Sequence, residues 1–247
     1  MAILFIRNAV RSLARKCGFQ VSRISNMPFG RDVWVDIARL GERWGFSINC
    51  VFDVGANIGE TSLTVLTHFP NAEVYSFEPH PDTFQILAAG LKGRRAQPFN
   101  IALSDKSGKA ELFTYEQDAI NSLTPTAPFA VRFGKYGKSI PIQVSTVDEF
   151  CSSHGIDAID VLKVDTEGCD LDVLRGATIA LKPKKIRFVY TEFNDIFERA
   201  GRTGGALVPI CGFLEPFGLR FVTCYTDDVV TDGELFTIHN VLFAASS

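Results

Sequence analysis

The sequence lacks the patterns that mark several common classes of protein. Its six cysteines are scattered over 247 residues without a CxxC pair, and its four histidines show neither HExxH nor HxxxH spacing. A structural zinc site is therefore not expected. No apolar run is long enough to cross a bilayer, and no apolar stretch with a small-residue cleavage site indicates a signal peptide. We predict a reduced, cytoplasmic protein.

The chain also has little net charge. Its 25 lysines and arginines stand against 28 aspartates and glutamates, a formal charge of −3. Because neutralising phosphates requires a basic surface, nucleic acid is not expected as a partner. The apolar content of 46% suffices for a layered core and excludes a disordered chain. The oligomeric state does not follow from these features.

The N-terminus is the basic part of the chain. Arginines repeat every four residues from Arg7 to Arg15, and apolar residues recur at helical spacing on another face. One interpretation is a helix that packs on the domain with its arginines in solvent. The other is a weak peripheral membrane contact through residues 1–17. We predict an N-terminal helical extension over 1–49 and the main domain over 50–247.

Strands and helices are expected to alternate through the main domain. Such alternation predicts an α/β fold with a mainly parallel sheet and helices on both faces. The last two strands are expected to form an antiparallel hairpin at the edge. Residues 116–140, which contain proline and glycine, are expected to form an insertion near the mouth of the pocket. The expected strands are 50–54, 73–77, 97–103, 109–115, 140–144, 159–164, 186–191, 218–225 and 236–244, and the expected helices include 58–68, 81–91 and one capped by Thr146.

A glycine turn follows the first of these strands. Residues 53–59 read DVGANIG, and Asn57 takes the place of the second glycine of the dinucleotide pattern GxGxxG. The phosphate-binding pattern GxxxxGK[ST] does not occur. Glu78 ends the next strand about twenty residues later, where a carboxylate can accept both hydroxyls of a ribose. A nucleoside with an amino-acid tail, such as S-adenosylmethionine, therefore fits this pocket better than a dinucleotide does.

Five motifs in order give a more specific indication. They read DVGANIG at 53–59, FEPHP at 77–81, NIALSD at 100–105, STVDEF at 145–150 and IDVLKVDTEG at 159–168. Together they resemble the FkbM family of S-adenosylmethionine-dependent methyltransferases over about residues 51–192. The resemblance implies a class I methyltransferase (Rossmann-like) fold, S-adenosylmethionine as cofactor, and O-methylation of sugars, polyketides or related small molecules. The family pattern Glu-Gly-Ala-Glu is replaced here by Glu167-Gly168-Cys169-Asp170, which shortens the last carboxylate by one methylene.

The turn, Glu78 and the resemblance define the expected cofactor-binding residues. These are Asp53, Gly55, Ala56, Asn57, Gly59, Glu78, Pro79, Ala102, Ser104, Asp105 and Asp165. Methyl transfer to an alcohol also needs a proton acceptor, which should lie at the same edge of the sheet. The catalytic candidates there are Asp165, Glu167, Lys163, Glu192 and His80.

Two of these candidates have alternative interpretations. Lys163 lies two residues before Asp165 and therefore shares its face of the strand, where it could keep Asp165 ionised, hold a substrate oxygen or only form an ion pair. His80 could accept a proton near neutral pH, or it could be a loop residue above the nucleoside.

The polar side chains at this edge would also suit a divalent cation such as Mg²⁺. They are Asp165, Glu167, Asp170, Glu192 and Asn194. Carboxylates in the first turn of a helix are already explained by the helix dipole, so we predict no metal. Two other functions stay open as alternatives: a nicotinamide-dependent oxidoreductase, and a non-catalytic module that binds a partner through residues 116–140.

Overall fold

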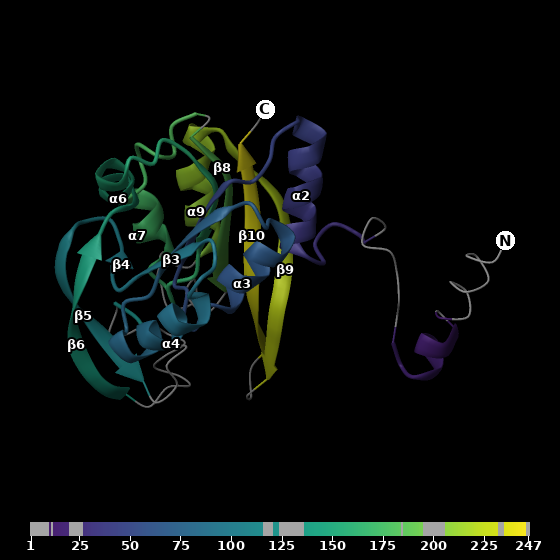
Figure 1. Cartoon of the computed structure of the whole chain (residues 1–247), viewed down its shortest axis with the longest axis horizontal. Coiled ribbons are helices and arrows are strands. Elements are labelled where there is room, and N and C mark those ends of the chain that lie inside the picture. Colours follow the sequence, from purple (N-terminus) through teal and green to yellow (C-terminus); the bar gives the residue numbers. More distant parts are fainter. Residues whose placement is uncertain are drawn as a thin grey trace.

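The computed structural model describes residues 10, 12–19, 27–115, 121–123, 136–183, 185–194, 206–231 and 235–245. Seven of the described strands form one sheet. They are β1 (Cys50–Val54), β2 (Glu73–Phe77), β3 (Ala96–Phe99), β7 (Ile159–Val164), β8 (Ile186–Asn194), β9 (Leu219–Thr231) and β10 (Leu235–Ala245). Their order is β3-β2-β1-β7-β8-β10-β9 (Figure 1).

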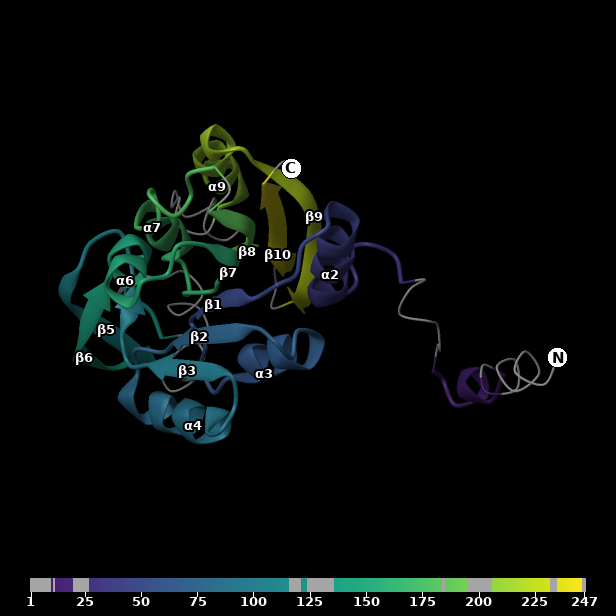
Figure 2. The same cartoon turned by 45° about the horizontal axis from the view of Figure 1, so that its top comes forward.

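The sheet is parallel from β3 to β8, and β10 pairs antiparallel with both β8 and β9. Helices cover both faces, as parallel strands require (Figure 2). One face carries α2 (Val33–Trp44), α3 (Glu60–His68) and α4 (Pro81–Leu91), and the other carries α6 (Val147–His154), α7 (Asp170–Arg175), α9 (Leu207–Leu214) and the 3-10 turn η3 (Glu215–Phe217). The α/β fold, its mainly parallel sheet and its antiparallel edge hairpin are confirmed.

Successive side chains of each strand point to opposite faces of the sheet, so they pack in two separate cores. On β1, Val51 faces α2 and α3, whereas Phe52 faces α6 and α7. The core that faces α6 and α7 is rich in phenylalanine. The rings of Phe77 and Phe150 meet edge to face with centroids 4.7 Å apart, and Phe52 packs on both.

Helix α2 belongs to this packed unit. The Asp32 carboxylate caps it by accepting from the backbone N–H of Trp34 at 2.9 Å. Asp36 is buried and accepts from the hydroxyl of Tyr225 on β9 at 2.9 Å. The apolar face of α2 thus completes one of the two cores, and the division between residues 49 and 50 stays a prediction.

A second, smaller sheet corrects the prediction for residues 97–103. The chain forms β3, breaks at Asn100, and continues as β4 (Ala102–Leu103). The break has a physical cause, since the Asn100 amide donates to the carbonyl oxygens of Glu78 (2.9 Å) and Pro79 (3.0 Å).

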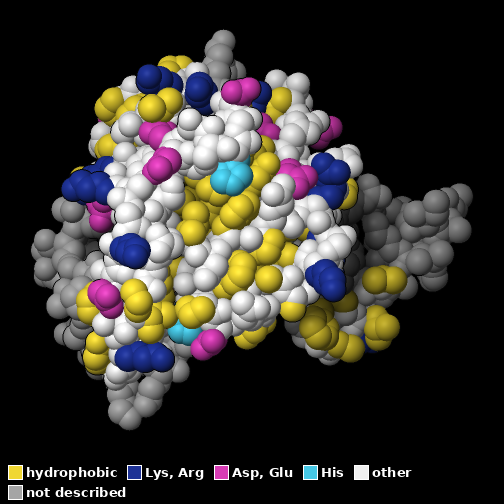
Figure 3. All heavy atoms as spheres, turned by 60° about the vertical axis from the view of Figure 1, so that its left-hand side comes forward, with side chains coloured by type: hydrophobic (Ala, Val, Ile, Leu, Met, Phe, Trp, Pro, Cys, Tyr) yellow, Lys and Arg dark blue, Asp and Glu magenta, His cyan; other side chains and the backbone are white. Residues whose placement is uncertain are grey.

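Two longer strands complete this small sheet. Strand β6 (Tyr136–Ser145) pairs parallel with β4 and antiparallel with β5 (Gly108–Tyr115). The strand predicted at 109–115 thus exists, and it pairs with β6. Strand β6 begins at residue 136, so the end of the predicted insertion is regular structure. Figure 3 views the side of the molecule that bears this sheet and shows hydrophobic side chains gathered in its middle, with charged ones around them.

The N-terminal segment is described only in part. Residues 12–16 are helical, and Figures 1 and 2 place this turn away from the sheet. Most of the predicted amphipathic pattern over 1–17 lies outside the described residues, so the membrane contact stays a prediction. Among the helices that the structure describes, none has the length and apolar character to cross a membrane.

Candidate functional site

A pocket opens at the carboxyl ends of β1, β2 and β7, where the strand order reverses. Open α/β sheets bind ligands at such a switch point. The residues that line the pocket are Val54, Gly55, Asn57, Phe77, Glu78, Pro79, Ile101, Ala102, Leu103, Leu112, Asn121, Leu123, Asp165, Thr166 and Glu167.

The glycine turn forms the floor of this pocket. Gly55 has a φ of +75°, and a Cβ there would lie 1.8 Å from the carbonyl oxygen of Asp165. Only glycine lets the turns after β1 and β7 approach this closely. Asn57 has a φ of +48°, a left-handed conformation that asparagine tolerates better than most residues. The position that departs from the dinucleotide pattern is therefore compatible with a tight turn.

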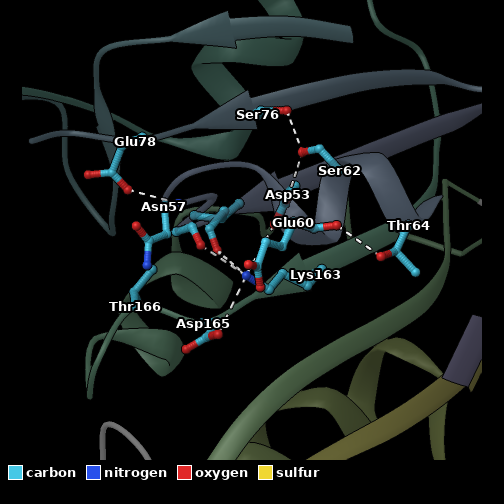
Figure 4. Close-up of polar contacts among 12 residues, drawn as sticks. Asp53, Asn57, Glu60, Ser62, Thr64, Ser76, Glu78, Lys163, Asp165 and Thr166 are labelled. Carbon is cyan, nitrogen blue, oxygen red and sulfur yellow. Dashed lines mark hydrogen bonds and ion pairs between the residues drawn. The ribbon is translucent and has the colours of Figure 1, made fainter. Parts of the chain in front are cut away.

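Glu78 closes one side of the pocket from the end of β2 (Figure 4). Its Oε2 accepts from the backbone N–H of Asn57 at 3.0 Å, and its Oε1 accepts from the N–H of His80 at 2.8 Å. Burial raises the pKa of Glu78, although these two hydrogen bonds and the charge of Lys163 act in the opposite direction. Each carboxylate oxygen can accept a second hydrogen bond, so the pair can bind two hydroxyls.

Lys163 and Asp53 form a buried ion pair under the turn. They are register partners on β7 and β1, and Lys163 Nζ lies 3.1 Å from Asp53 Oδ1 (Figure 4). The same Nζ donates to the carbonyl oxygen of Gly55 at 3.0 Å and lies 3.5 Å from Asp165 Oδ2. Burial alone would lower the pKa of Lys163, but the two carboxylates outweigh it and raise that pKa.

This pair revises two of the predicted roles. Asp53 is fully buried, and its second oxygen accepts from the Ser62 hydroxyl at 2.6 Å, so its carboxylate does not face the pocket. Lys163 is 4% exposed and is surrounded by oxygens of the protein itself. The geometry favours ion pairing with Asp53 and Asp165 over contact between Lys163 and a substrate.

Three carboxylates gather near the ends of β7 and β8, and two of them, Asp165 and Glu167, line the pocket. Asp165, Glu167 and Glu192 each have an oxygen within 4.8 Å of the others, a spacing that could also hold a cation. Burial raises the pKa of both Glu167 and Glu192, and the negative charge of Asp165 raises each further. Glu192 and Asp165 also share a hydrogen bond. The sequence prediction that these side chains meet at one sheet edge is confirmed.

Asp170 has a structural role in the loop after β7. Its carboxylate is 1% exposed and accepts from the backbone N–H groups of Thr166 (3.1 Å) and Gly168 (3.3 Å). The shorter side chain at this position therefore shapes the turn that presents Glu167. Burial raises the pKa of Asp170 to about 7, and the charge of Asp165 contributes.

The raised pKa of Asp170 predicts a pH-dependent stability. An unfolded Asp loses its proton near pH 4, whereas folded Asp170 keeps it to about pH 7. Between these values the native state binds more protons, so the free energy of unfolding should fall as pH rises, by up to about 1.4 kcal/mol per pH unit from this group. We expect urea titrations from pH 4 to 7 to show a shallower slope for Asp170→Asn. Asp172→Asn, on the exposed face of α7, should keep the wild-type slope; an unchanged slope in Asp170→Asn would contradict this account.

Other predicted site residues lie outside the pocket. His80 caps α4 through Nδ1, which accepts from the N–H of Thr83 at 3.4 Å, so the structure favours a structural role over proton transfer. Asp105 lies at the surface beside Lys106. Ala56, Gly59 and Ser104 support the surrounding turns without lining the cavity, and the side chain of Asn194 lies outside the described residues.

Some lining residues were not predicted individually. Leu112 on β5 was not expected in the pocket, whereas Asn121 and Leu123 belong to the segment 116–140 that was expected near its mouth. An Asn-Ser-Leu sequence in a loop gives no local signal for such a contact. Phe77 and Thr166 are adjacent to predicted residues and could have been inferred from the strand ends.

Comparison with known proteins agrees with this geometry. The family described as "Methyltransferase FkbM domain" matches residues 53–217, about two thirds of the chain. The chain is 28% identical over 155 residues to 2-O-methyltransferase NoeI of Sinorhizobium fredii, which covers 59% of this chain and 63% of that protein. It is 30% identical over 161 residues to hexuronic acid methyltransferase AglP of Haloferax volcanii, covering 64% and 62%.

A third relative, 31-O-demethyl-FK506 methyltransferase FkbM of Streptomyces tacrolimicus, is 29% identical over 197 residues, covering 70% of this chain and 73% of that protein. The chain spans about three fifths of the length of NoeI and AglP. The family match begins at the glycine turn and includes Glu78 and the three carboxylates. The chain therefore belongs to the FkbM methyltransferase family.

Proposed function

We propose that this protein transfers a methyl group from S-adenosylmethionine to a hydroxyl group of a sugar, glycan or related small molecule. Family membership supports methyl transfer. The single observation that carries the proposal is one pocket lined both by a ribose-type carboxylate, Glu78, and by Glu167, a carboxylate with a raised pKa.

The pocket suits the proposed methyl donor. Glu78 can accept from the two ribose hydroxyls, and Gly55 keeps the floor clear of side chains. Apolar side chains from β2, β4 and β5 can pack on the flat face of the adenine ring. They include Phe77, Ala102 and Leu112. When bound, S-adenosylmethionine would supply a methyl group bonded to a positively charged sulfur, and this sulfur would be the leaving group when an oxygen bonds to the methyl carbon.

Glu167 is the proposed proton acceptor. It lines the pocket, and its raised pKa makes it a stronger base than an ordinary glutamate. The acceptor hydroxyl would give its proton to Glu167 as its oxygen bonds to the methyl carbon and the carbon–sulfur bond breaks. Asp165 is paired with Lys163 and hydrogen bonded to Glu192, so it is proposed to position and tune Glu167.

The names of two relatives guide the choice of acceptors. AglP is called a hexuronic acid methyltransferase and NoeI a 2-O-methyltransferase. We therefore expect S-adenosylhomocysteine to form when purified protein is incubated with S-adenosylmethionine and a panel of hexuronic acids and other hydroxylated sugars, followed by mass spectrometry. Tight binding of NAD would instead favour the oxidoreductase alternative. Binding of S-adenosylmethionine without turnover on any acceptor would favour the non-catalytic module.

Glu78 provides a direct test of donor binding. We expect Glu78→Ala to weaken binding of S-adenosylhomocysteine roughly 10- to 150-fold, because hydrogen bonds to a charged carboxylate contribute about 1.5–3 kcal/mol. Isothermal titration calorimetry measures this change. Glu73→Gln, at the opposite end of the same strand, should bind like the wild type. Undiminished affinity in Glu78→Ala would refute the assignment of the ribose site.

A further inference from the structure

A short segment between β5 and β6, residues 121–123, holds Asn121 against the pocket. Ser122 and Phe113 exchange backbone hydrogen bonds of 2.9 and 3.1 Å, which joins the segment to β5. The Ser122 hydroxyl donates to the carbonyl oxygen of Glu167 at 2.9 Å. The segment therefore connects β5 with the loop after β7, and both Asn121 and Leu123 line the cavity between them.

The orientation of the Asn121 amide is fixed by its neighbour. The backbone N–H of Tyr115 donates to Asn121 Oδ1 at 3.0 Å, and only the amide oxygen can accept this bond. The NH₂ group must then occupy the other side of the amide. Its Nδ2 is buried and has no hydrogen-bond partner within the described part of the chain. A buried donor without an acceptor is costly, so a ligand that supplies an acceptor here gains affinity.

We propose that Asn121 Nδ2 donates a hydrogen bond to a ring nitrogen of the adenine of the methyl donor, an inference that rests on the proposed function. Apolar side chains line the pocket together with Asn121, among them Leu112 and Leu123, which pack in one cluster. They suit the face of a base and disfavour the charged carboxylate of the amino-acid tail. The ammonium of that tail cannot accept a hydrogen bond. The ribose hydroxyls are assigned to Glu78 as donors but keep lone pairs, so deaza analogues are needed to distinguish them from the unprotonated ring nitrogens, which the apolar lining favours.

Deaza analogues of S-adenosylhomocysteine test this contact, because each replaces one ring nitrogen by CH. We expect one of the 1-deaza, 3-deaza and 7-deaza analogues to bind the wild type about tenfold or more weakly than S-adenosylhomocysteine does. In Asn121→Asp and Asn121→Ala, the difference in affinity between that analogue and S-adenosylhomocysteine should shrink to about twofold or less. Asn121→Asp keeps an oxygen for Tyr115, and comparison of analogues within one variant cancels any general effect of its added charge.

The controls separate this contact from folding and from the proposed function. Asn49→Asp alters an exposed amide that donates to Ser47, so it should keep the wild-type order of affinities. Thermal unfolding curves show whether each variant folds. Equal binding of all three analogues to the wild type, or a gap that persists in both Asn121 variants, would overturn the inference. Failure of the wild type to bind S-adenosylhomocysteine at all would overturn the proposed function itself.

Discussion

Glu167→Gln should lower kcat/KM about 10²- to 10⁴-fold while the affinity for S-adenosylhomocysteine stays within about twofold of the wild type. A positioned general base contributes acceleration of that size, and glutamine cannot accept the hydroxyl proton. The side chain keeps its length and its place in the pocket, so donor binding should survive. Steady-state methyl transfer to an acceptor found in the panel, together with calorimetry, measures both quantities. Glu111→Gln, an exposed change on β5, serves as the control.

The pH profile gives a second readout of the same base. Because Glu167 must be deprotonated to act, kcat/KM should rise with pH through its raised pKa. Asp165→Asn removes a negative neighbour that raises the pKa of Glu167, so it should shift the acidic limb to lower pH. A fall in activity without such a shift would mean that Asp165 acts in another way.

The same assay tests the predicted absence of a metal. Activity should persist in excess EDTA, since Lys163 already balances Asp165 and a hydrogen bond joins Asp165 to Glu192. Loss of activity in EDTA that Mg²⁺ restores would assign the three carboxylates to a cation. It would also contradict the role of Glu167 as the proton acceptor.

Local patterns predicted much of the fold because the forces concerned act within a few residues. Strand β1 and helix α4 have the predicted bounds, and Thr146 caps α6 by accepting from the N–H of Glu149 at 3.0 Å. The predicted strand 97–103 failed because the hydrogen bonds of Asn100 reach the loop after another strand. Periodicity carries no information about such a partner.

The site, too, could be predicted only in part from the sequence. The carboxyl ends of parallel strands must meet, so Glu78 and Asp165 could be placed in one pocket from the sequence. The shared face of Lys163 and Asp165 also followed from alternation. The buried pair of Lys163 with Asp53 required the register between β1 and β7, and the contact of Asn121 required the pairing of β5. Those facts depend on tertiary structure.

The buried ion pair of Lys163 with Asp53 should contribute strongly to stability. Lys163→Met should lower the free energy of unfolding by about 3–5 kcal/mol, because it leaves the Asp53 carboxylate buried without its countercharge. Methionine fills a similar volume, so loss of packing contributes little. Urea denaturation measures the change. Lys106→Met, at an exposed lysine, should stay within about 0.5 kcal/mol of the wild type.

A double variant distinguishes the lost charge pair from other causes. Asp53→Asn combined with Lys163→Met removes both charges, and an amide can still accept from Ser62, so part of the stability should return. Binding should not recover with it. The Lys163 ammonium also donates to the carbonyl oxygen of Gly55 and pairs with Asp165. The double variant lacks both contacts, so the turns after β1 and β7 are no longer held in place at the pocket. If the double variant regained stability and wild-type affinity together, Lys163 would act only as a countercharge for Asp53; weak binding in a restored fold would show that it also holds the site in place.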